Sequence, residues 1–458
     1  MTDDRRPNVT APVLESTRAA ESRVRDRRAE LSRRLFERAV AVMPGGNTRT
    51  QLFTAPHPMY AQNAQGARVT LVDGQVLDDF LLNYTAAAVG HRHPAVEAAA
   101  RDALSRGGAA GLPTEDEVIY AETLCARVPG LERVRFTTSG SEATLHAIRV
   151  ARAYTGKPAI AKAEGAYHGS HDLTDFNVWR FASGPLTPQS GTRGMPAALE
   201  EAIVVFPFND LSGTEAVLDE HWHKLAAVIM EPFLNAGGVI PATVEYLKGV
   251  ARWCAAKDVL FILDEVASFR TSFRGAQDDY GVRPDLTCFG KAIGGGFPLG
   301  AFGGREDVMA VLDPRRDDAI RHSGTFNAQP VALAAGRAAL ELLDKDAITR
   351  MNALGRRVAE GMRELGTRSS YPITATVYGS IGSIHGGASV PRTAREAADR
   401  RVLPEALYWL LFDAGILVAP RGQFSISVAT TETQVERFLA ALPPALENLR
   451  LARGSEEG

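Results

Sequence analysis

Short apolar runs alternate with amphipathic stretches through much of the chain. The runs that read as buried strands lie at residues 134–137, 159–162, 202–206, 226–230, 259–263 and 286–289. Most of them are separated by stretches with helical periodicity, such as residues 243–257. Strands that alternate with helices predict an α/β fold with a mostly parallel sheet covered on both faces. Such a sheet binds ligands at the carboxyl ends of its strands.

The pattern changes after residue 330. Helical stretches are expected at residues 331–343, 351–365 and 432–449. Strand-like pieces lie between them, at residues 374–378, 382–385 and 424–428. This mixture predicts a smaller α+β domain.

Four segments follow from these patterns. A large domain is predicted at residues 77–330 and the smaller domain at residues 331–458. Residues 35–76 are expected to join the smaller domain. Residues 1–34 carry charges of both signs and are expected to form an exposed arm or helix.

Composition narrows the class of protein. The chain has 458 residues, which is enough for two or three domains, and a net charge of −3, which argues against bulk nucleic-acid binding. Cys125, Cys254 and Cys288 show neither zinc spacing nor a disulfide framework. No apolar run is long enough for a membrane span, and the N-terminus lacks the apolar core of a signal peptide. These features predict a cytoplasmic protein without a membrane partner.

An acid and a lysine each follow a strand-like run. Asp264 follows residues 259–263, and Lys291 follows residues 286–289 and opens a glycine-rich stretch. A lysine there can form a Schiff base, and an aspartate can hold a protonated ring nitrogen, as a pyridoxal phosphate enzyme requires. The alternatives are a surface lysine and an acid that caps a helix, although Glu265 could do the capping.

A phosphate-binding turn is predicted after the first of these strands. Ser139 and Glu142 have the spacing of a capping box, which places the backbone N–H groups of Gly140 and Ser141 at a helix N-terminus. That geometry favours a phosphate. The alternative is an ordinary capped helix.

Three further turns could carry site residues. Tyr167 and His168 follow one strand, Glu231 follows another, and Thr325 lies in a Ser/Gly/Thr turn. Tyr167 could stack on a flat ring, and the Thr325 turn could meet a phosphate. The histidine pairs lack an attendant carboxylate on a helix, so no metal site is predicted.

The turns occur in one order, each after a strand, and together they resemble the class III aminotransferases of pyridoxal phosphate fold type I. The resemblance covers residues 35–449. It is carried by SGSEA (139–143), YHG (167–169), DEV (264–266), GK (290–291), GGG (294–296) and GTFN (324–327). Within this class the chain is most similar to the glutamate-1-semialdehyde aminomutase-like branch.

The resemblance implies a role for each motif. Lys291 forms the Schiff base with pyridoxal 5′-phosphate, Asp264 pairs with the pyridine nitrogen, and Tyr167 stacks on the ring. The other implied cofactor-binding residues are Ser139, Gly140, Ser141, His168, Glu231, Val266 and, from the partner subunit, Thr325. The family also implies a homodimer with active sites at the interface.

Two arginines bear on the substrate. Residues 43–49 are shorter than the matching segment of aminomutases and resemble β-phenylalanine aminotransferases, in which an arginine at the position of Arg49 grips a carboxylate. Arg421 lies in a segment that resembles the same subgroup. Two guanidinium groups can hold carboxylates bidentately, although Arg421 could instead be a rim residue. Leu234 departs from the class, which often has a polar residue there; Asn235 could replace it.

The leading prediction is an aminotransferase that moves an amino group from an amino acid, such as a β-amino or aryl amino acid, to a 2-oxo acid. An aminomutase or an epimerase on the same scaffold is the first alternative. A non-catalytic cofactor-binding protein is an alternative of another class, and the presence of both Lys291 and Asp264 argues against it.

Overall fold

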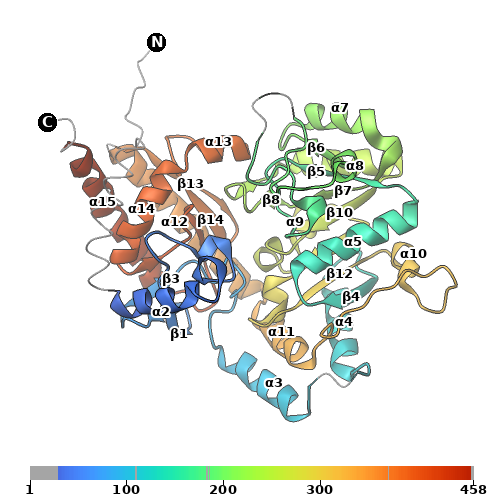
Figure 1. Cartoon of the computed structure of the whole chain (residues 1–458), viewed down its shortest axis with the longest axis horizontal. Coiled ribbons are helices and arrows are strands. Elements are labelled where there is room, and N and C mark those ends of the chain that lie inside the picture. The colour runs from blue at the N-terminus through green and yellow to red at the C-terminus, as the bar shows by residue number, and fades with distance from the viewer. Residues whose placement is uncertain (1–28, 109–110, 182–183, 185, 370, 455–458) are drawn as a thin grey trace.

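The computed structural model describes residues 29–454 except 109–110, 182–183, 185 and 370. Residues 1–28 of the predicted arm therefore lie outside the described residues. Helix α2 (Glu30–Val40) begins directly after them. Figure 1 shows the chain in two lobes, with the elements numbered as below.

A seven-stranded sheet forms the centre of the larger lobe. Its order is β4 (Arg133–Thr137), β12 (Gly300–Gly304), β11 (Leu286–Phe289), β10 (Leu260–Asp264), β7 (Leu225–Met230), β5 (Ala159–Ala163) and β6 (Ile203–Phe206). Strand β12 is antiparallel to both of its neighbours, and the other six strands run in one direction. The predicted α/β fold with a mostly parallel sheet is confirmed.

Strand β12 was missed by the sequence pattern. It reads Gly-Ala-Phe-Gly-Gly, which has low strand propensity. The strand lies too close to its neighbour β4 to carry a side chain at Gly303, since a Cβ atom there would lie 2.1 Å from the carbonyl oxygen of Arg133. Tertiary packing therefore imposes the strand conformation on a segment whose own strand propensity is low.

Helices cover both faces of the sheet, and the strands are buried on both sides. In β10, Leu260 and Ile262 face the layer that contains α5 (Gly140–Thr155), whereas Phe261 and Leu263 face the layer of α8 (Val244–Lys257). This period of two is the signature of a strand between two apolar layers. Burial of both faces is the main stabilising contribution to the lobe.

Shorter helices complete this lobe. They are α3 (Pro94–Ser105), α4 (Glu115–Arg127), α6 (Ala197–Glu201), α7 (Leu211–His221), α9 (Ala276–Tyr280), α10 (Glu306–Met309) and α11 (Pro330–Leu342). A two-stranded sheet, β8 (Phe233–Leu234) with β9 (Ile240–Pro241), follows the main strand β7.

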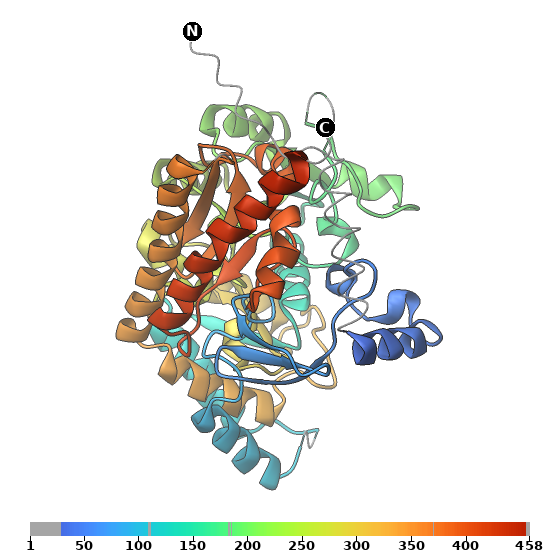
Figure 2. The same ribbon diagram turned by 90° about the vertical axis from the view of Figure 1, so that its left-hand side faces the viewer.

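The second lobe joins the two ends of the described chain. β1 (Ala61–Gln65), β2 (Arg68–Leu71) and β3 (Val76–Asp79) form a sheet with β15 (Ile416–Leu417). A second sheet contains β13 (Ile373–Tyr378), β14 (Ile381–Gly386) and β16 (Gln423–Ser425). The helices are α12 (Lys345–Arg368), α13 (Ala394–Asp399), α14 (Val402–Asp413) and α15 (Glu432–Gly454), and Figure 2 shows α15 and α14 above the N-terminal strands.

Two boundaries in this lobe differ from the prediction. The helix expected at residues 351–365 is the 24-residue α12, which begins after the capping residue Asp344. The strand expected at residues 424–428 ends at Ser425, because Ile426 and Val428 bond to Ser380 and Ala88 outside a strand. The four predicted domain segments stay a prediction. Among the described residues, no helix combines the length and the apolar character needed to cross a bilayer.

Candidate active site

Most of the predicted site residues meet at one edge of the main sheet. Ser139 follows β4, Tyr167 follows β5, Glu231 follows β7, and Lys291 follows β11. Asp264 is the last residue of β10 rather than the first residue beyond it. Because these strands run in one direction, their carboxyl ends place the residues around one region.

Lys291 lies in a constrained turn. Its φ is +48°, in the left-handed region that residues with a Cβ atom rarely adopt. The Tyr120 hydroxyl donates to the carbonyl oxygen of Ile293, at 2.5 Å, and a Cβ atom on Gly336 of α11 would lie 2.0 Å from the same oxygen. The turn is therefore held by α4 and α11 from outside the sheet.

Charged neighbours act on the half-buried Lys291 ammonium group. Removal from solvent lowers its pKa, and the positive charge of Arg270 acts in the same direction. The carboxylates of Asp264 and Glu231 oppose this shift. The net lowering increases the fraction of unprotonated amine, which is the nucleophilic form.

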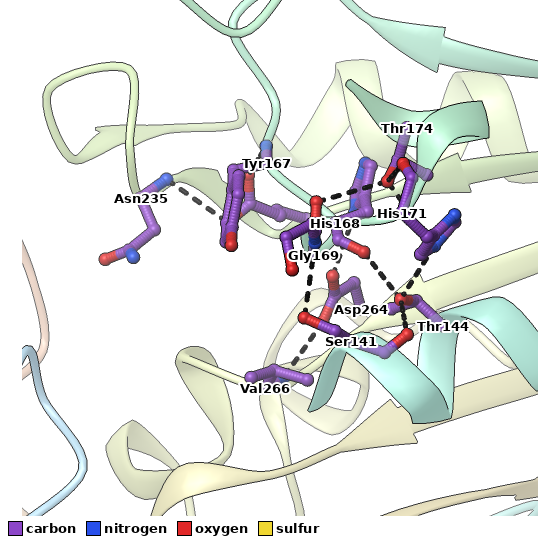
Figure 3. Close-up of polar contacts among 12 residues, drawn as sticks. Ser141, Thr144, Tyr167, His168, Gly169, His171, Thr174, Asn235, Asp264 and Val266 are labelled. Atoms are coloured by element: carbon purple, nitrogen blue, oxygen red, sulfur yellow. Dashed lines mark hydrogen bonds and ion pairs between the residues drawn. The ribbon is translucent and has the colours of Figure 1, made fainter. Parts of the chain in front are cut away.

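Asp264 is buried and is oriented by two donors. His168 Nδ1 lies 2.8 Å from Asp264 Oδ2, and the N–H of Val266 donates to Oδ1 at 3.0 Å. Burial lowers the pKa of His168, although the bond to Asp264 opposes the shift. His168 Nε2 is buried and has no partner among the described atoms. Figure 3 shows Asp264 beside the Tyr167–Gly169 turn and the start of α5.

The predicted turn at residues 139–142 caps α5. The Ser139 hydroxyl accepts the N–H of Glu142 at 3.2 Å. The reciprocal bond of a capping box is shifted by one residue, since the Glu142 carboxylate accepts the N–H and the hydroxyl of Thr138, both at 2.8 Å. The N-terminal end of α5 faces the Tyr167–Gly169 turn, and the Ser141 hydroxyl accepts the N–H of Ser170 at 3.3 Å.

A narrow slot lies beside the start of α5. A Cβ atom on Gly140 would be 2.7 Å from Val266 Cγ1, and one on Gly290 would be 3.2 Å from the Gly140 Cα. Side chains larger than hydrogen at these positions would displace Val266. The strand ends therefore bring Gly140, Val266 and the residue before Lys291 into contact.

Glu231 is buried and accepts two backbone N–H groups. Its Oε2 accepts the N–H of Tyr167 at 3.0 Å, and its Oε1 accepts the N–H of Asn235 at 3.3 Å. Burial raises the pKa of Glu231, and the negative charge of Asp264 acts in the same direction. The site thus places Glu231, whose protonated form is favoured, near the carboxyl group of Asp264.

Leu234, which stands where the class often has a polar residue, lies in the core. Leu234 is fully buried among apolar side chains of the α8 layer. The neighbouring Asn235 side chain accepts a bond from Gln423 Nε2, at 2.7 Å. The Asn235 amide oxygen is thereby occupied by a bond to the other lobe.

The two arginines predicted for the substrate both lie near Tyr84. Arg49 Nη1 donates to Asn83 Oδ1 at 2.8 Å, and the Arg421 guanidinium lies 4.3 Å from the centre of the Trp179 ring. Burial raises the pKa of the Tyr84 phenol, whereas the charges of Arg421 and Arg49 both lower it. Arg49 is exposed and Arg421 is half-buried.

Two cavities lie beside Lys291 and Arg49. One of about 710 Å³ is lined by Lys291, Ser139, Gly140, His91 and Asn83, among others. A second of about 370 Å³ is lined by Arg49, Tyr84, Asn83 and His91, among others. Asn83 and His91 lie on both linings, so the lysine side and the arginine side share a wall.

Thr325 does not meet the other predicted residues within one chain. It is exposed, and no bond joins it to them in the part of the chain that the structure describes. The adjoining Phe326 is 63% exposed.

A family model for the class-III aminotransferases matches residues 53–442. The chain belongs to this family. Its fold is the type I fold of pyridoxal phosphate enzymes, and its cofactor is pyridoxal 5′-phosphate. The resemblance seen in the sequence is confirmed at this level.

Three relatives of this class-III chain illustrate the range of the family. A glutamate-1-semialdehyde 2,1-aminomutase from Pyrobaculum calidifontis is 38% identical over 429 residues, which are 91% of this chain and 95% of that protein. The structure of an omega-transaminase from Sphaerobacter thermophilus has a TM-score of 0.88 and 39% identity, covering 92% and 98% of the two chains. A β-phenylalanine aminotransferase from Variovorax paradoxus has a TM-score of 0.87 and 31% identity, covering 95% and 98%.

The residues of this class-III chain fit a flat, phosphate-bearing cofactor. The N-terminus of α5 offers donors to an anion, and the close approach of Gly140 to Val266 leaves a slot beside Lys291. A buried carboxylate stands at the end of β10, oriented by His168. Among the described residues, no group of histidine, cysteine and acidic side chains could hold a metal ion.

Sequence reasoning missed several residues of this class-III site. Thr144 donates its hydroxyl proton to the His168 carbonyl at 2.5 Å, one turn into α5, and its spacing from Gly140 could have indicated it. Asn83, Tyr84 and Arg270 carry no local signal, because they reach the site through irregular segments.

Proposed function

We propose that the chain is an aminotransferase that moves an amino group from a β-amino or aryl amino acid to a 2-oxo acid. One observation carries the proposal: Lys291 lies in a cavity that shares a wall with the cavity of Arg49. A reactive amine in one cavity and the Arg49 guanidinium group in the other suit a substrate with an amino group and a carboxylate.

The residues at the strand ends would hold the cofactor. Gly140 and Ser141 would donate backbone N–H groups to its phosphate, with Ser139 capping the helix that carries them. Asp264 would face the ring nitrogen, and Tyr167 and Val266 would cover the ring. His168 and Glu231 would hold Asp264 and Tyr167 in place.

The cofactor, when bound, supplies an electron sink for the substrate carbon. Lys291 Nζ, held in its strained turn, would hold the cofactor covalently until the amine of the donor displaces it, and the freed lysine amine would then take the proton from the amine-bearing carbon of the donor. Asp264, oriented by His168 and the N–H of Val266, would keep the ring nitrogen protonated.

The surroundings of Arg421 favour an aryl or β-amino donor. The Trp179 and Tyr167 rings lie 6.5 Å apart between their centres, and Arg421 stacks on Trp179. This supplies an apolar face next to a guanidinium group, which suits an aromatic side chain with a carboxylate. The likeness to the β-phenylalanine aminotransferase supports the same donor.

A glutamate-1-semialdehyde aminomutase is the second candidate. The 38% identity to the Pyrobaculum aminomutase over nearly the full length favours it. An aminomutase retains both nitrogens in one active site and needs no external 2-oxo acid.

A homodimer is part of the proposal. Thr325 and Phe326 are exposed in the single chain, and Phe297, on the wall of the Lys291 cavity, is 39% exposed. A second copy that covers these residues would bring Thr325 to the phosphate of its partner.

A half-reaction tests the proposed function. Protein loaded with pyridoxal phosphate is mixed with β-phenylalanine and no 2-oxo acid, and the amount of pyridoxamine phosphate is measured. The expected result is conversion at each active site, which stops when the cofactor is used. No conversion with β-phenylalanine, together with conversion of glutamate-1-semialdehyde to 5-aminolevulinate, would instead establish the aminomutase.

A further inference from the structure

A left-handed turn separates the two cavities. Leu82, Asn83, Tyr84 and Thr85 have φ values of +48°, +50°, +53° and +74°. The N–H of Thr85 donates to the carbonyl oxygen of Leu81 at 3.2 Å, and that of Ala87 donates to Leu82 at 3.0 Å. Four consecutive residues with Cβ atoms rarely adopt this conformation, so the surroundings must impose it.

Asp79 fixes the beginning of the left-handed turn. Its Oδ1 accepts the N–H groups of Leu81 and Leu82 at 2.9 and 2.8 Å. Its Oδ2 lies 2.7 Å from His91 Nε2. One buried carboxylate therefore orients both the backbone that enters the turn and a histidine that lines both cavities.

Arg270 fixes the end of the turn. Its Nη1 donates to the carbonyl oxygen of Thr85 at 2.8 Å, and its Nη2 donates to that of Ile426 in the other lobe. Arg270 is 1% exposed, and no carboxylate pairs with it within the described part of the chain. Burial lowers its pKa to about 9. Its remaining contact is with Met351 Sδ, at 4.0 Å from Nη2. A buried guanidinium group without a carboxylate partner is costly, which points to a role for the segment it holds.

The turn carries the contacts that orient the arginine side. Asn83 accepts the bond from Arg49, and Asn83 lies on the linings of both cavities. The Tyr84 hydroxyl donates to the carbonyl oxygen of Gln51 at 3.0 Å, which ties the turn to the segment just after Arg49. The position of Arg49 therefore depends on the conformation of residues 82–85.

We propose that Arg270 is a positioning residue for substrate recognition: it holds the left-handed turn so that Asn83 and Tyr84 place Arg49 against the carboxylate of the donor. This inference rests on the proposed two-arginine site. It adds a residue that touches no substrate and acts through the backbone of Thr85.

Arg127 offers a matched control. It is also a buried arginine without a carboxylate partner among the described residues, and its guanidinium donates to the carbonyl oxygens of Phe273, Leu340 and Leu343. Burial lowers its pKa to about 10. Its guanidinium also lies over the rings of Phe269 and Phe273, near Arg270 in the sequence, but none of these contacts is made with residues 82–85. Arg127→Met should therefore reproduce the loss of stability of Arg270→Met without its effect on recognition.

The test compares Arg270→Met, Arg270→Lys and Arg127→Met as holoenzymes. Donors are β-phenylalanine and 1-phenylethylamine, which lacks the carboxylate, and binding of 3-phenylpropanoate is measured by calorimetry. For Arg270→Met we expect KM for β-phenylalanine to rise at least about tenfold, with kcat and the amine donor affected much less. Arg270→Lys should recover part of the loss, and Arg127→Met should leave the donor ratio within about twofold.

A second variant keeps the proposal testable if Arg270→Met does not fold. Asn83→Ala removes the bond to Arg49 from a cavity wall and should weaken 3-phenylpropanoate binding in the same direction. Equal donor ratios for Arg270→Met and Arg127→Met, or wild-type binding by Asn83→Ala, would overturn the inference. Tight 3-phenylpropanoate binding without turnover of β-phenylalanine would refute only the proposed donor, since the binding comparison would still decide the role of Arg270.

Discussion

The candidate site has two parts that are built differently: a strand-end wall around Lys291 and a loop wall around Arg49. The strand-end wall consists of residues 139–141, 167–168, 231, 264 and 291, which follow strands of one rigid sheet. The loop wall consists of Arg49, Asn83, Tyr84 and Arg421, which come from irregular segments far apart in the sequence. A cofactor common to a family needs fixed geometry, whereas the loop wall can change without disturbing the sheet. The strand-end wall therefore identifies the family, whereas the choice of donor depends on the loop wall.

The largest effect is expected at the strand-end wall. Lys291→Ala removes the only amine proposed to bond the cofactor and to move the proton. Turnover should fall by more than about a thousandfold, because both nucleophile and base are lost. Thermal unfolding should stay close to that of the wild type, since the lysine turn is also held by Tyr120 and α11. Turnover within tenfold of the wild type would contradict the strand-end assignment.

Asp264 and Glu265 provide a neighbouring pair with separate roles. Asp264→Asn removes the carboxylate that meets His168, and turnover should fall roughly 100- to 1,000-fold. Glu265 instead accepts the N–H groups of Ala276 and Gln277 and the hydroxyl of Ser268. Glu265→Gln should destabilise the fold by about 1–3 kcal/mol, measured by urea unfolding, without lowering kcat in the folded fraction. Loss of stability alone in Asp264→Asn, together with loss of turnover alone in Glu265→Gln, would contradict this assignment of roles.

The loop wall is tested by removing a charge. Arg49→Ala should reduce kcat/KM for β-phenylalanine roughly 10- to 100-fold, because a charge-assisted bond to the carboxylate is lost. The value for 1-phenylethylamine should change little. Arg38→Ala, on the exposed face of α2, serves as the control. Equal losses for both donors would remove Arg49 from the substrate site.

A small, pH-dependent effect is expected at Glu231. Its pKa is raised by burial, so near neutral pH the protonated form is favoured, and a glutamine resembles that form. Glu231→Gln should therefore lower turnover only about threefold near pH 7. As the pH rises, the wild-type carboxyl ionises and the glutamine does not, so the two pH profiles should diverge on the alkaline side. Parallel profiles would contradict this prediction, because they would show that Glu231 does not titrate in the range measured.

The sequence predicted the strand-end wall because its signals are local. Ser139 and Glu142 cap α5 within four residues, and Asp264 and Lys291 adjoin the strands that place them. Strand β12 was missed because its glycines are required by neighbours rather than by strand propensity.

The loop wall was predicted only in part, because its conformation depends on distant contacts. Arg49 and Arg421 entered through the resemblance, and the contact of Arg421 with Trp179 has no signal in the sequence around Arg421. The left-handed turn contains no glycine that would have indicated it. Thr85, at the end of the turn, is held by Arg270, which is 185 residues away along the chain.

Chemical trapping of the cofactor tests the central claim most directly. The structure buries a second lysine, Lys162 on β5, whose pKa is lowered to about 7 by burial, so it is the natural rival of Lys291. Protein loaded with pyridoxal phosphate is reduced with borohydride, digested and examined by mass spectrometry. We expect one modified peptide per chain, with the cofactor on Lys291. Modification of Lys162 or of a surface lysine, with Lys291 unmodified, would contradict it.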